Sequence, residues 1–549
     1  MKIYKKITTV LAILVFSYCF HGCDEEFLEV EAKSGVFENT LFNSYSNANL
    51  FLTNLYNRID VDNFVEAGFY LPAISDDLME TFEHQPPETW FRTKSFGAVD
   101  NKFLDIWSDS YTAIRQCNLL IEKMADAPAI SDEEKNLLIG QAKFLRGHFY
   151  FEMSKWWGGV PLIDKVLNRD SGEDLEYARS TYVQTIEFVR KDMTEAAALL
   201  PNTWTNERGR ATKGAALALR SEAELYSSMW AECVATTQEI MDMGIYSIAP
   251  EYAPIFLPEG EDNSEVIFDI PFDGANKAHA FEVFYSPRYD NTAKAPIGWG
   301  YALPTQNLID AYEFIDGSPG NDPIRANDPY VDRDKRFYAS IIYNRSEWRG
   351  GPIITEVDPS NSSAPSNYFD GQNGTLEHQG TLTGYYMKKT LDESLLPSEN
   401  STGNPINGTN IIFTRYAEIL LNFAEAKNEL SGPSDDIYDA INELRARGGV
   451  PLLSGLDQVT LREKIRNERR VELAFEGKRY WDLLRWKTAV STFSQPLGAM
   501  KIENNNNVFT YTRQPAYRGK RTFDEKHYLL PIPQVVIDRN SKITQNPGW

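Results

Sequence analysis

The sequence predicts a mainly α-helical protein, in which tetratricopeptide-like helix pairs form a scaffold and one large loop-rich region carries short strands. Two observations lead to this prediction. Apolar residues recur at helical spacing through an N-terminal helical part, residues 23–244, and a C-terminal helical part, residues 411–549. The loop-rich region between them, residues 245–410, is rich in Gly, Pro, Asn and aromatic residues and lacks sustained helical periodicity. Strand-like runs occur within it, at residues 265–268 and 338–343.

The first 22 residues have the pattern of a bacterial lipoprotein signal peptide. Three lysines precede a mostly apolar run over residues 7–20, which is shorter than a membrane-spanning helix needs. Cys23 follows the small residue Gly22 and is the expected lipidation site. Cys19 is the alternative, but a bulky tyrosine precedes it. Acyl chains on Cys23 would anchor the mature protein to a lipid bilayer.

Six helices are predicted in the N-terminal helical part. They cover residues 38–59, 103–124, 131–156, 177–200, 211–227 and 230–243. Ser131, with Glu134 three residues later, has the capping-box pattern that begins a helix. Ala215, Ala218 and Leu219 fall on one face of the fifth helix, and the two alanines are small enough for close helix contact.

Helices resume in the C-terminal helical part at residues 411–430 and 435–447. The segment over residues 230–243 is expected to pair with the one over residues 411–430, although the loop-rich region separates them in sequence. Long irregular segments that are not disordered are usually functional. The aromatic content of the loop-rich region argues against disorder, so ligand binding is expected there.

A charged stretch over residues 461–487 holds nine basic and five acidic residues among aromatic ones. It predicts a helix ended by Gly477 and a second helix after it. Three local ion pairs are expected at a spacing of three residues: Arg469 with Glu472, Glu476 with Arg479, and Asp482 with Arg485. The alternating charges indicate a buried network with guanidinium groups stacked on rings. A nucleic-acid or phosphate patch is the alternative, and the net charge of −23 argues against it.

Part of this stretch, ERRVELAFEGKRYWDLLRW, closely resembles the signature near the C-terminus of the SusD/RagB family of outer-membrane nutrient-binding lipoproteins. Further segments resemble blocks of that family in the same order. They are residues 142–163, 298–317, 331–344, 383–389 and 530–549. The resemblance implies a helical body with tetratricopeptide-like pairs, a loop-rich capping region and no catalytic activity.

The resemblance also implies partners and a location. Members of the family dock onto a SusC-like TonB-dependent transporter in the outer membrane, over which the lipoprotein acts as a lid. The acidic residues 24–26 resemble the tract that directs such lipoproteins to the cell exterior. The expected ligand is an oligosaccharide or polysaccharide, and no nucleic-acid partner is expected. A peptide nutrient is the alternative ligand.

Sugar binding requires exposed aromatic rings for the flat C–H faces of the sugar and polar groups for its hydroxyls. Six aromatic residues in loops are the candidates for glycan contacts, and for each of them loop packing is the competing interpretation. They are Trp90, Tyr285, Tyr289, Trp299, Trp348 and Tyr368.

No motif for catalysis or for a resident cofactor appears, such as HExxH, GxSxG, a P-loop or a Rossmann glycine pattern. A glycoside hydrolase needs two carboxylates at a set separation, and nothing singles out such a pair. A pure protein-binding repeat scaffold is a further alternative. Four aspartates near turns are candidates for a structural calcium site, although capping of turns is the competing interpretation: Asp322, Asp328, Asp332 and Asp334. Cys117 and Cys233 are expected to be buried free thiols.

Overall fold

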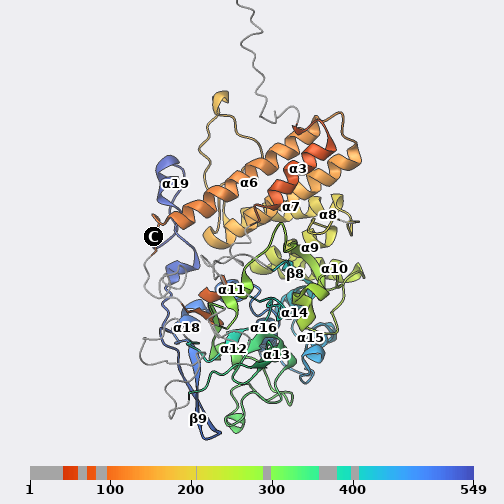
Figure 1. Cartoon of the computed structure of the whole chain (residues 1–549). Helices are drawn as coiled ribbons and strands as arrows, with labels where there is room; N and C mark the ends of the chain where they lie inside the picture. Colours follow the sequence, from red (N-terminus) through yellow and green to blue (C-terminus); the bar gives the residue numbers. More distant parts are fainter. Residues whose placement is uncertain are drawn as a thin grey trace, which may run out of the picture.

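The structure is a computed structural model that describes residues 41–59, 71–81, 96–205, 207–287, 298–357, 380–396 and 407–549. Helices dominate these residues and the strands are short, which confirms the predicted mainly α class (Figure 1). One continuous cluster of buried apolar side chains includes residues from the N-terminal helical part, the loop-rich region and the C-terminal helical part. The described parts of all three regions therefore share a core.

Consecutive helices of the N-terminal helical part pack against one another. They are α3 (Tyr45–Tyr56), α6 (Asn101–Ala125), α7 (Asp132–Trp157), α8 (Tyr182–Leu199), α9 (Lys213–Tyr226) and α10 (Trp230–Asp242). The predicted capping box is present at the start of α7, where the Ser131 side chain accepts from the backbone N–H of Glu134 and the Glu134 carboxylate accepts from that of Ser131. Figure 1 shows α6 and α7 as long orange helices that cross the upper half of the molecule.

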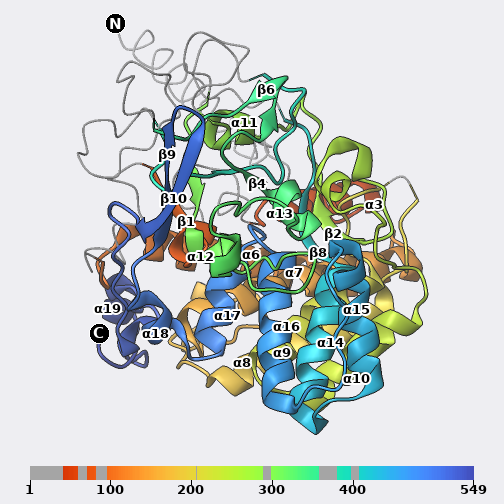
Figure 2. The same cartoon turned by 90° about the horizontal axis from the view of Figure 1, so that it is seen from below.

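The C-terminal helical part continues the array after the loop-rich region. Its helices are α14 (Tyr416–Ser431), α15 (Asp435–Gly448), α16 (Gln458–Glu472), α17 (Arg479–Arg485), α18 (Ala489–Phe493) and α19 (Gln534–Arg539). Helix α14 packs on α10, and Figure 2 shows the two side by side. Cys233 of α10 and Ala426 of α14 lie in one buried apolar cluster. The predicted pairing of these two helices across the loop-rich region is confirmed.

Two predicted helix boundaries are wrong. Ile411–Arg415 form strand β8 and not the first turn of a helix, because this run of β-branched and aromatic residues pairs with strand β2 (Val266–Ile270). Helix α16 ends at Glu472, because the chain then turns through positive φ angles of 67° at Phe475 and 75° at Gly477.

The strands that the structure describes form five antiparallel pairs. Besides β2 and β8, they pair β1 (Leu78–Glu80) with β3 (Ala302–Pro304), β4 (Ile341–Ile342) with β7 (Tyr386–Met387), β5 (Glu347–Trp348) with β6 (Gly351–Pro352), and β9 (Gly498–Asn505) with β10 (Val508–Pro515). The turn between β9 and β10 has positive φ at Asn506 and Asn507, which asparagine tolerates well.

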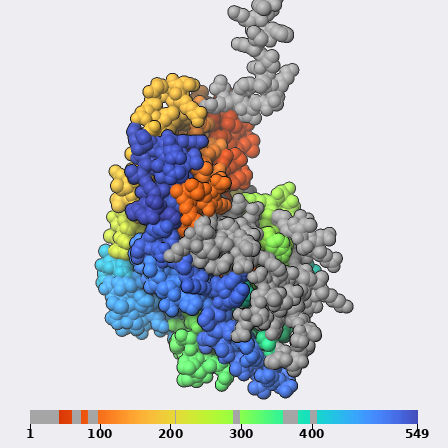
Figure 3. Space-filling model, turned by 90° about the vertical axis from the view of Figure 1, so that its left-hand side faces the viewer, coloured from red at the N-terminus to blue at the C-terminus, as the bar shows by residue number. Residues whose placement is uncertain are grey.

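Short helices complete the loop-rich region and its surroundings. The α-helices are α11 (Phe281–Tyr285), α12 (Gln306–Ile309) and α13 (Lys335–Ser340), and the 3₁₀ helices are Leu71–Ile74, Arg169–Ser171, Ala253–Phe256, Pro258–Gly260, Pro323–Arg325 and Glu525–Tyr528. The strand-like run predicted over residues 338–343 is thus the end of α13 followed by β4. The end of the chain follows one side of the molecule as a blue band (Figure 3), and the backbone N–H of Leu530 donates to the carbonyl of Trp156 at 2.8 Å.

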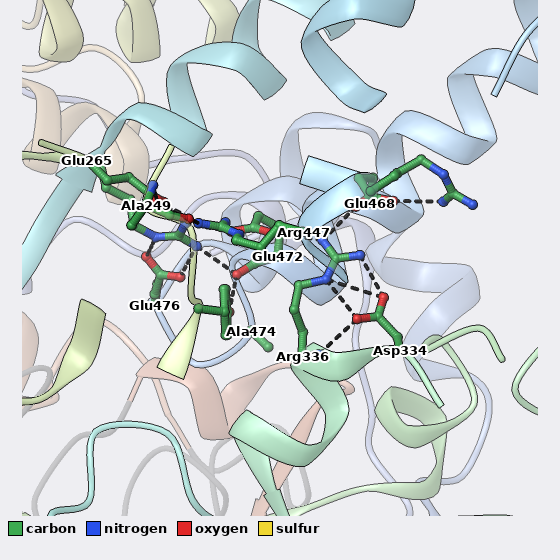
Figure 4. Close-up of polar contacts among 12 residues, drawn as sticks. Ala249, Glu265, Asp334, Arg336, Arg447, Glu468, Glu472, Ala474 and Glu476 are labelled. Atoms are coloured by element: carbon green, nitrogen blue, oxygen red, sulfur yellow. Dashed lines mark hydrogen bonds and ion pairs between the residues drawn. The ribbon is translucent and has the colours of Figure 1, made fainter. Parts of the chain in front are cut away.

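The charged stretch takes part in a buried ion-pair network that joins β8 to α16 and the turn after it (Figure 4). The Arg415 guanidinium is fully buried and lies among three carboxylates. Its Nη1 lies 2.6 Å from Glu265 Oε1 and 2.5 Å from Glu472 Oε1, and its Nη2 lies 2.6 Å from Glu476 Oε1. Burial by itself would raise the pKa of Glu472, but the guanidinium groups around this carboxylate hold its pKa well below the usual range.

Arg336 extends the network from α13. It lies 2.6 Å from Glu468 and 2.8 Å from Glu472, and it also pairs with Asp334 on its own element. The predicted stacking of guanidinium groups on rings within the charged stretch is confirmed, since Arg466 lies 4.6 Å and Arg485 4.8 Å from the centre of the Trp486 ring. The network therefore ties the loop-rich region to the C-terminal helices.

Of the three local ion pairs that the sequence predicts, only Asp482 with Arg485 forms, at 2.8 Å. Arg469 reaches Asp482 at 2.9 Å, and Arg479 reaches Asp76, distant in sequence, at 2.8 Å. Arg469 and Glu472 both lie in α16, but Glu472 binds Arg415 instead. Glu476 and Arg479 do not pair because α16 ends at Glu472, so they do not share a helix face.

Cys117 and Cys233 are buried free thiols, as predicted. Among the described residues, no helix is both long and apolar enough to cross a membrane.

Candidate glycan-binding face

Three of the six predicted glycan contacts fall outside the described residues: Trp90, Tyr289 and Tyr368. The lipidation site Cys23 and the signal peptide also fall outside them. The structure places the other three candidates, Tyr285, Trp299 and Trp348, and it separates them clearly by exposure.

Tyr285 and Trp348 are fully buried, so the expectation that they are exposed rings is wrong. The Tyr285 ring ends α11 and lies 5.2 Å from the ring of Phe281. The Trp348 ring in β5 is covered by the guanidinium of Arg349 at 5.1 Å and by the ammonium of Lys388 at 6.0 Å. A fully buried ring offers no surface to a sugar, and the loop-packing interpretation fits these two residues.

Trp299 is partly exposed and is held firmly in place. Its backbone N–H donates to the carbonyl of Val283 at 2.8 Å, and its ring meets that of Phe284 edge to face, with centroids 5.2 Å apart. Phe284 therefore helps to hold the ring in place, and sequence reasoning missed this residue because no motif marks it. A fixed, partly exposed indole is the geometry that a sugar-stacking residue requires.

Glycine follows Trp299 for a steric reason. Gly300 has a φ of 55°, and a side-chain Cβ there would lie 2.7 Å from the Tyr386 ring. The backbone N–H of Gly300 donates to the carbonyl of Ser286 at 3.0 Å, which fixes the chain against the end of α11. Glycine at position 300 thus leaves room for the Tyr386 ring of β7.

Two of the segments that carry candidate glycan contacts are flanked by described residues close to Trp299. The backbone N–H of Thr81 donates to the carbonyl of Tyr301 at 3.1 Å, and Thr81 is the last described residue before the segment that carries Trp90. Gly298, adjacent to Trp299, is the first described residue after the segment that carries Tyr289. The pairing of β1 with β3 therefore places Thr81 and Gly298, the described residues that flank these two segments, in the same neighbourhood.

The segment that carries Tyr368 begins and ends beside β9. The backbone N–H of Val357 donates to the carbonyl of Ile502 at 2.8 Å, and that of Met500 donates to the carbonyl of Thr383 at 2.9 Å. Strand β7 follows Thr383 and packs against β3, the strand that follows Trp299. The described residues that flank the Tyr368 segment are therefore linked to Trp299 by contacts between short strands. We refer to Trp299, Phe284 and these flanking residues as the Trp299 face.

A buried carboxyl group braces this region. Glu282 Oε1 accepts a hydrogen bond from Asn407 Nδ2 at 2.6 Å and one from the backbone N–H of Asp392 at 3.1 Å. Burial raises the pKa of Glu282 to about 7. The Glu282 carboxyl therefore links α11 to Asp392 and Asn407, which lie on either side of residues 397–406.

Two of the four aspartates considered for calcium have other roles in the structure. Asp322 accepts from the backbone N–H of Ile324 at the start of a 3₁₀ helix, and Asp334 both begins α13 and binds Arg336. In the part of the chain that the structure describes, no group of three or more His, Cys, Asp or Glu side chains is arranged to hold a metal ion. For Asp322 and Asp334 the capping interpretation fits the structure.

Comparisons with known proteins agree with this architecture. Residues 264–549 match the model of the SusD family, and residues 26–225 match a family described as starch-binding and associating with the outer membrane. SusD-like protein P25 of Formosa agariphila is 26% identical over 562 residues, which covers 98% of this chain and 97% of that protein.

Solved structures show the same similarity. A SusD-like protein from Bacteroides fragilis is 31% identical, with a TM-score of 0.80 over 93% of this chain and 98% of the other. A SusD-like carbohydrate-binding protein from the same species is 28% identical, with a TM-score of 0.75 over 92% of this chain and 100% of the other. A laminarin-binding SusD-like protein, 22% identical with a TM-score of 0.68 over 92% of this chain and 99% of the other, shares the fold. Because these likenesses extend over nearly all of the sequence and the family model matches residues 264–549, the chain belongs to the SusD family.

Proposed function

We propose that the mature protein is a cell-surface lipoprotein that binds an oligosaccharide or polysaccharide and delivers it to a SusC-like TonB-dependent transporter. The observation that carries the glycan part is the partly exposed Trp299 ring, which Phe284 and two backbone hydrogen bonds hold in place. Relatives described as carbohydrate-binding support the same ligand class. The Trp299 face is the proposed contact surface, with Trp90, Tyr289 and Tyr368 as further contacts.

The protein is proposed to bind its ligand without cleaving it. Glu282 has the raised pKa of a general acid, but it is fully buried and its Oε1 is engaged by Asn407 and Asp392. Glycosidic bond cleavage requires an acid of this kind within reach of the substrate, together with a second carboxylate at a set separation. Glu282 does not meet the first condition.

A glycan panel tests binding and turnover together. Native gels cast with individual polysaccharides should retard the mature protein for at least one glycan, while no reducing ends are released from any of them. Trp299→Ala should lower the affinity for the retained glycan by roughly five- to thirty-fold, because a lost stacking contact costs about 1–2 kcal/mol. Tyr517→Ala, another partly buried aromatic change, is the matched control and should bind normally. Release of reducing ends would establish an enzyme, and retardation by no glycan would favour a peptide ligand.

Membrane attachment is proposed to depend on Cys23. Cells fed a labelled fatty acid should incorporate it into the wild-type protein and not into Cys23→Ser, because the acyl chains have no other attachment point in the mature N-terminus. Cys19→Ser should label normally and serves as the control for the alternative cysteine. Purification of the anchored protein from native outer membranes should also recover a TonB-dependent transporter. Labelling of Cys23→Ser, or a protein that external protease cannot reach in intact cells, would contradict the proposed anchor or its orientation.

A further inference from the structure

A cavity of about 390 Å³ lies within the helical body, and its described lining does not include the residues of the Trp299 face. The lining comes from the end of α3, from α6, α7 and α9, from strands β2 and β8, and from the turn between α16 and α17. Figure 1 shows α7 above β8, and both elements contribute residues to the lining. Its volume falls at the lower end of the range for small-molecule sites, so it has room for one or two sugar rings and not for a polysaccharide.

Aromatic rings form much of the cavity wall. Trp156 of α7 and Trp481 of α17 both line it and meet edge to face, with ring centroids 4.5 Å apart. Phe144 and Phe149 add two further rings from α7. Flat apolar walls of this kind suit a ligand that has an apolar C–H face.

The charged residues that line the cavity are nearly balanced, four basic and five acidic, and two of the ammonium groups are paired with carboxylates. Lys155 lies 2.7 Å from Glu152, and Lys478 lies 3.3 Å from Glu222 and 3.0 Å from Glu418. Two ammonium groups thus face carboxylates of the same region, which leaves little net field to attract a charged ligand. Carboxylates and ammonium groups nevertheless keep capacity for further hydrogen bonds to hydroxyl groups.

His148 is a polar group in this wall whose ring lacks a hydrogen-bond partner among the described residues, and Arg58 Nε, in the same wall, also lacks one. Its side chain is only 6% exposed, it lines the cavity, and it makes no hydrogen bond to any residue that the structure describes. Burial lowers its pKa, so the imidazole is neutral at pH 7 and offers one donor and one acceptor. A hydroxyl-bearing ligand in the cavity would give the imidazole the hydrogen-bond partners that it lacks among the described residues.

We propose that this cavity is a second binding site, specific for a neutral mono- or disaccharide. A sugar hydroxyl is both a donor and an acceptor, like the neutral imidazole of His148, and a pyranose C–H face matches the rings of Trp156 and Trp481. The paired charges disfavour phosphorylated or acidic sugars. The site would bind short products or units, whereas the Trp299 face contacts a longer chain.

Histidine NMR signals give a direct readout of this cavity. The chain has only six histidines, so selective ¹³Cε1 labelling yields few signals, and the one missing from His148→Asn belongs to His148. Glucose, galactose, mannose, xylose and their disaccharides are titrated one at a time into the mature protein. At least one of them should shift the His148 signal saturably, while the signal of His527, buried elsewhere, stays in place.

Two variants localise the effect. Leu219→Trp places a bulky ring where Leu219 lines the cavity. It should lower the affinity for the sugar that shifts the His148 signal at least tenfold. Glu152→Gln, a milder change at a half-exposed carboxylate, should also weaken it and covers the case in which Leu219→Trp is less stable. Retention of the polysaccharide in native gels should persist in both variants, so this proposal and that for the Trp299 face fail separately. The proposal is wrong if no neutral sugar moves the His148 signal, if only charged sugars move it, or if the shift is the same in both variants as in the wild type.

Discussion

Replacing Arg415 with methionine should lower the free energy of unfolding by about 3–5 kcal/mol. The change keeps an apolar stem of similar length but removes the charge that lies within 2.6 Å of Glu265, Glu472 and Glu476. These carboxylates are buried or nearly so. Without the guanidinium they would repel one another and remain buried without a counter-charge, which costs more free energy than the lost hydrogen bonds alone. Urea unfolding followed by circular dichroism measures the difference.

Two further variants show whether unpaired charge causes that loss. Arg208→Met makes the same change at an exposed arginine, which pairs with Asp262 at 2.8 Å, and should cost at most about 1 kcal/mol. The double variant Arg415→Met, Glu476→Gln should be more stable than Arg415→Met, because glutamine carries no charge that needs the guanidinium. Equal losses for Arg415→Met and Arg208→Met would show that the buried network contributes no more than a surface ion pair.

The sequence predicts the helical scaffold well because its signals are local. The capping box at Ser131 depends on neighbouring residues only, and it begins α7 as expected. The pairing of α10 with α14 follows from apolar periodicity and from the repeat pattern, even across the loop-rich region. Each of these predictions rests on information contained within one or two helices.

Local spacing fails where partners come from distant segments. Residues 411–415 have an apolar pattern that continues into a helix, and only pairing with β2, nearly 150 residues earlier, makes them a strand. Arg479 likewise finds Asp76 and not the neighbouring Glu476. The burial of Trp348 is a similar case, since Arg349 and Lys388 cover its ring and the composition of a loop gives no sign of this. Trp348→Ala is accordingly expected to reduce stability, whereas the loop position of Trp348 predicts a ligand contact.

Replacing Trp481 with alanine should lower the free energy of unfolding by about 3–5 kcal/mol, because it removes a large buried ring and leaves a cavity. The ring is 4% exposed, meets Trp156 edge to face at 4.5 Å and lies 4.9 Å from the Lys155 ammonium. Thermal melts and urea unfolding measure the loss.

Trp299→Ala is the matched comparison for Trp481→Ala, because it deletes the same side chain at a partly exposed position. It should weaken polysaccharide retention with little change in melting temperature, whereas Trp481→Ala should lose retention only as the protein unfolds. This contrast follows if the helical body maintains the fold and the Trp299 face binds the glycan. A Trp481→Ala protein that melts like the wild type yet no longer retains the polysaccharide would place the glycan contact at the helical body and overturn that division.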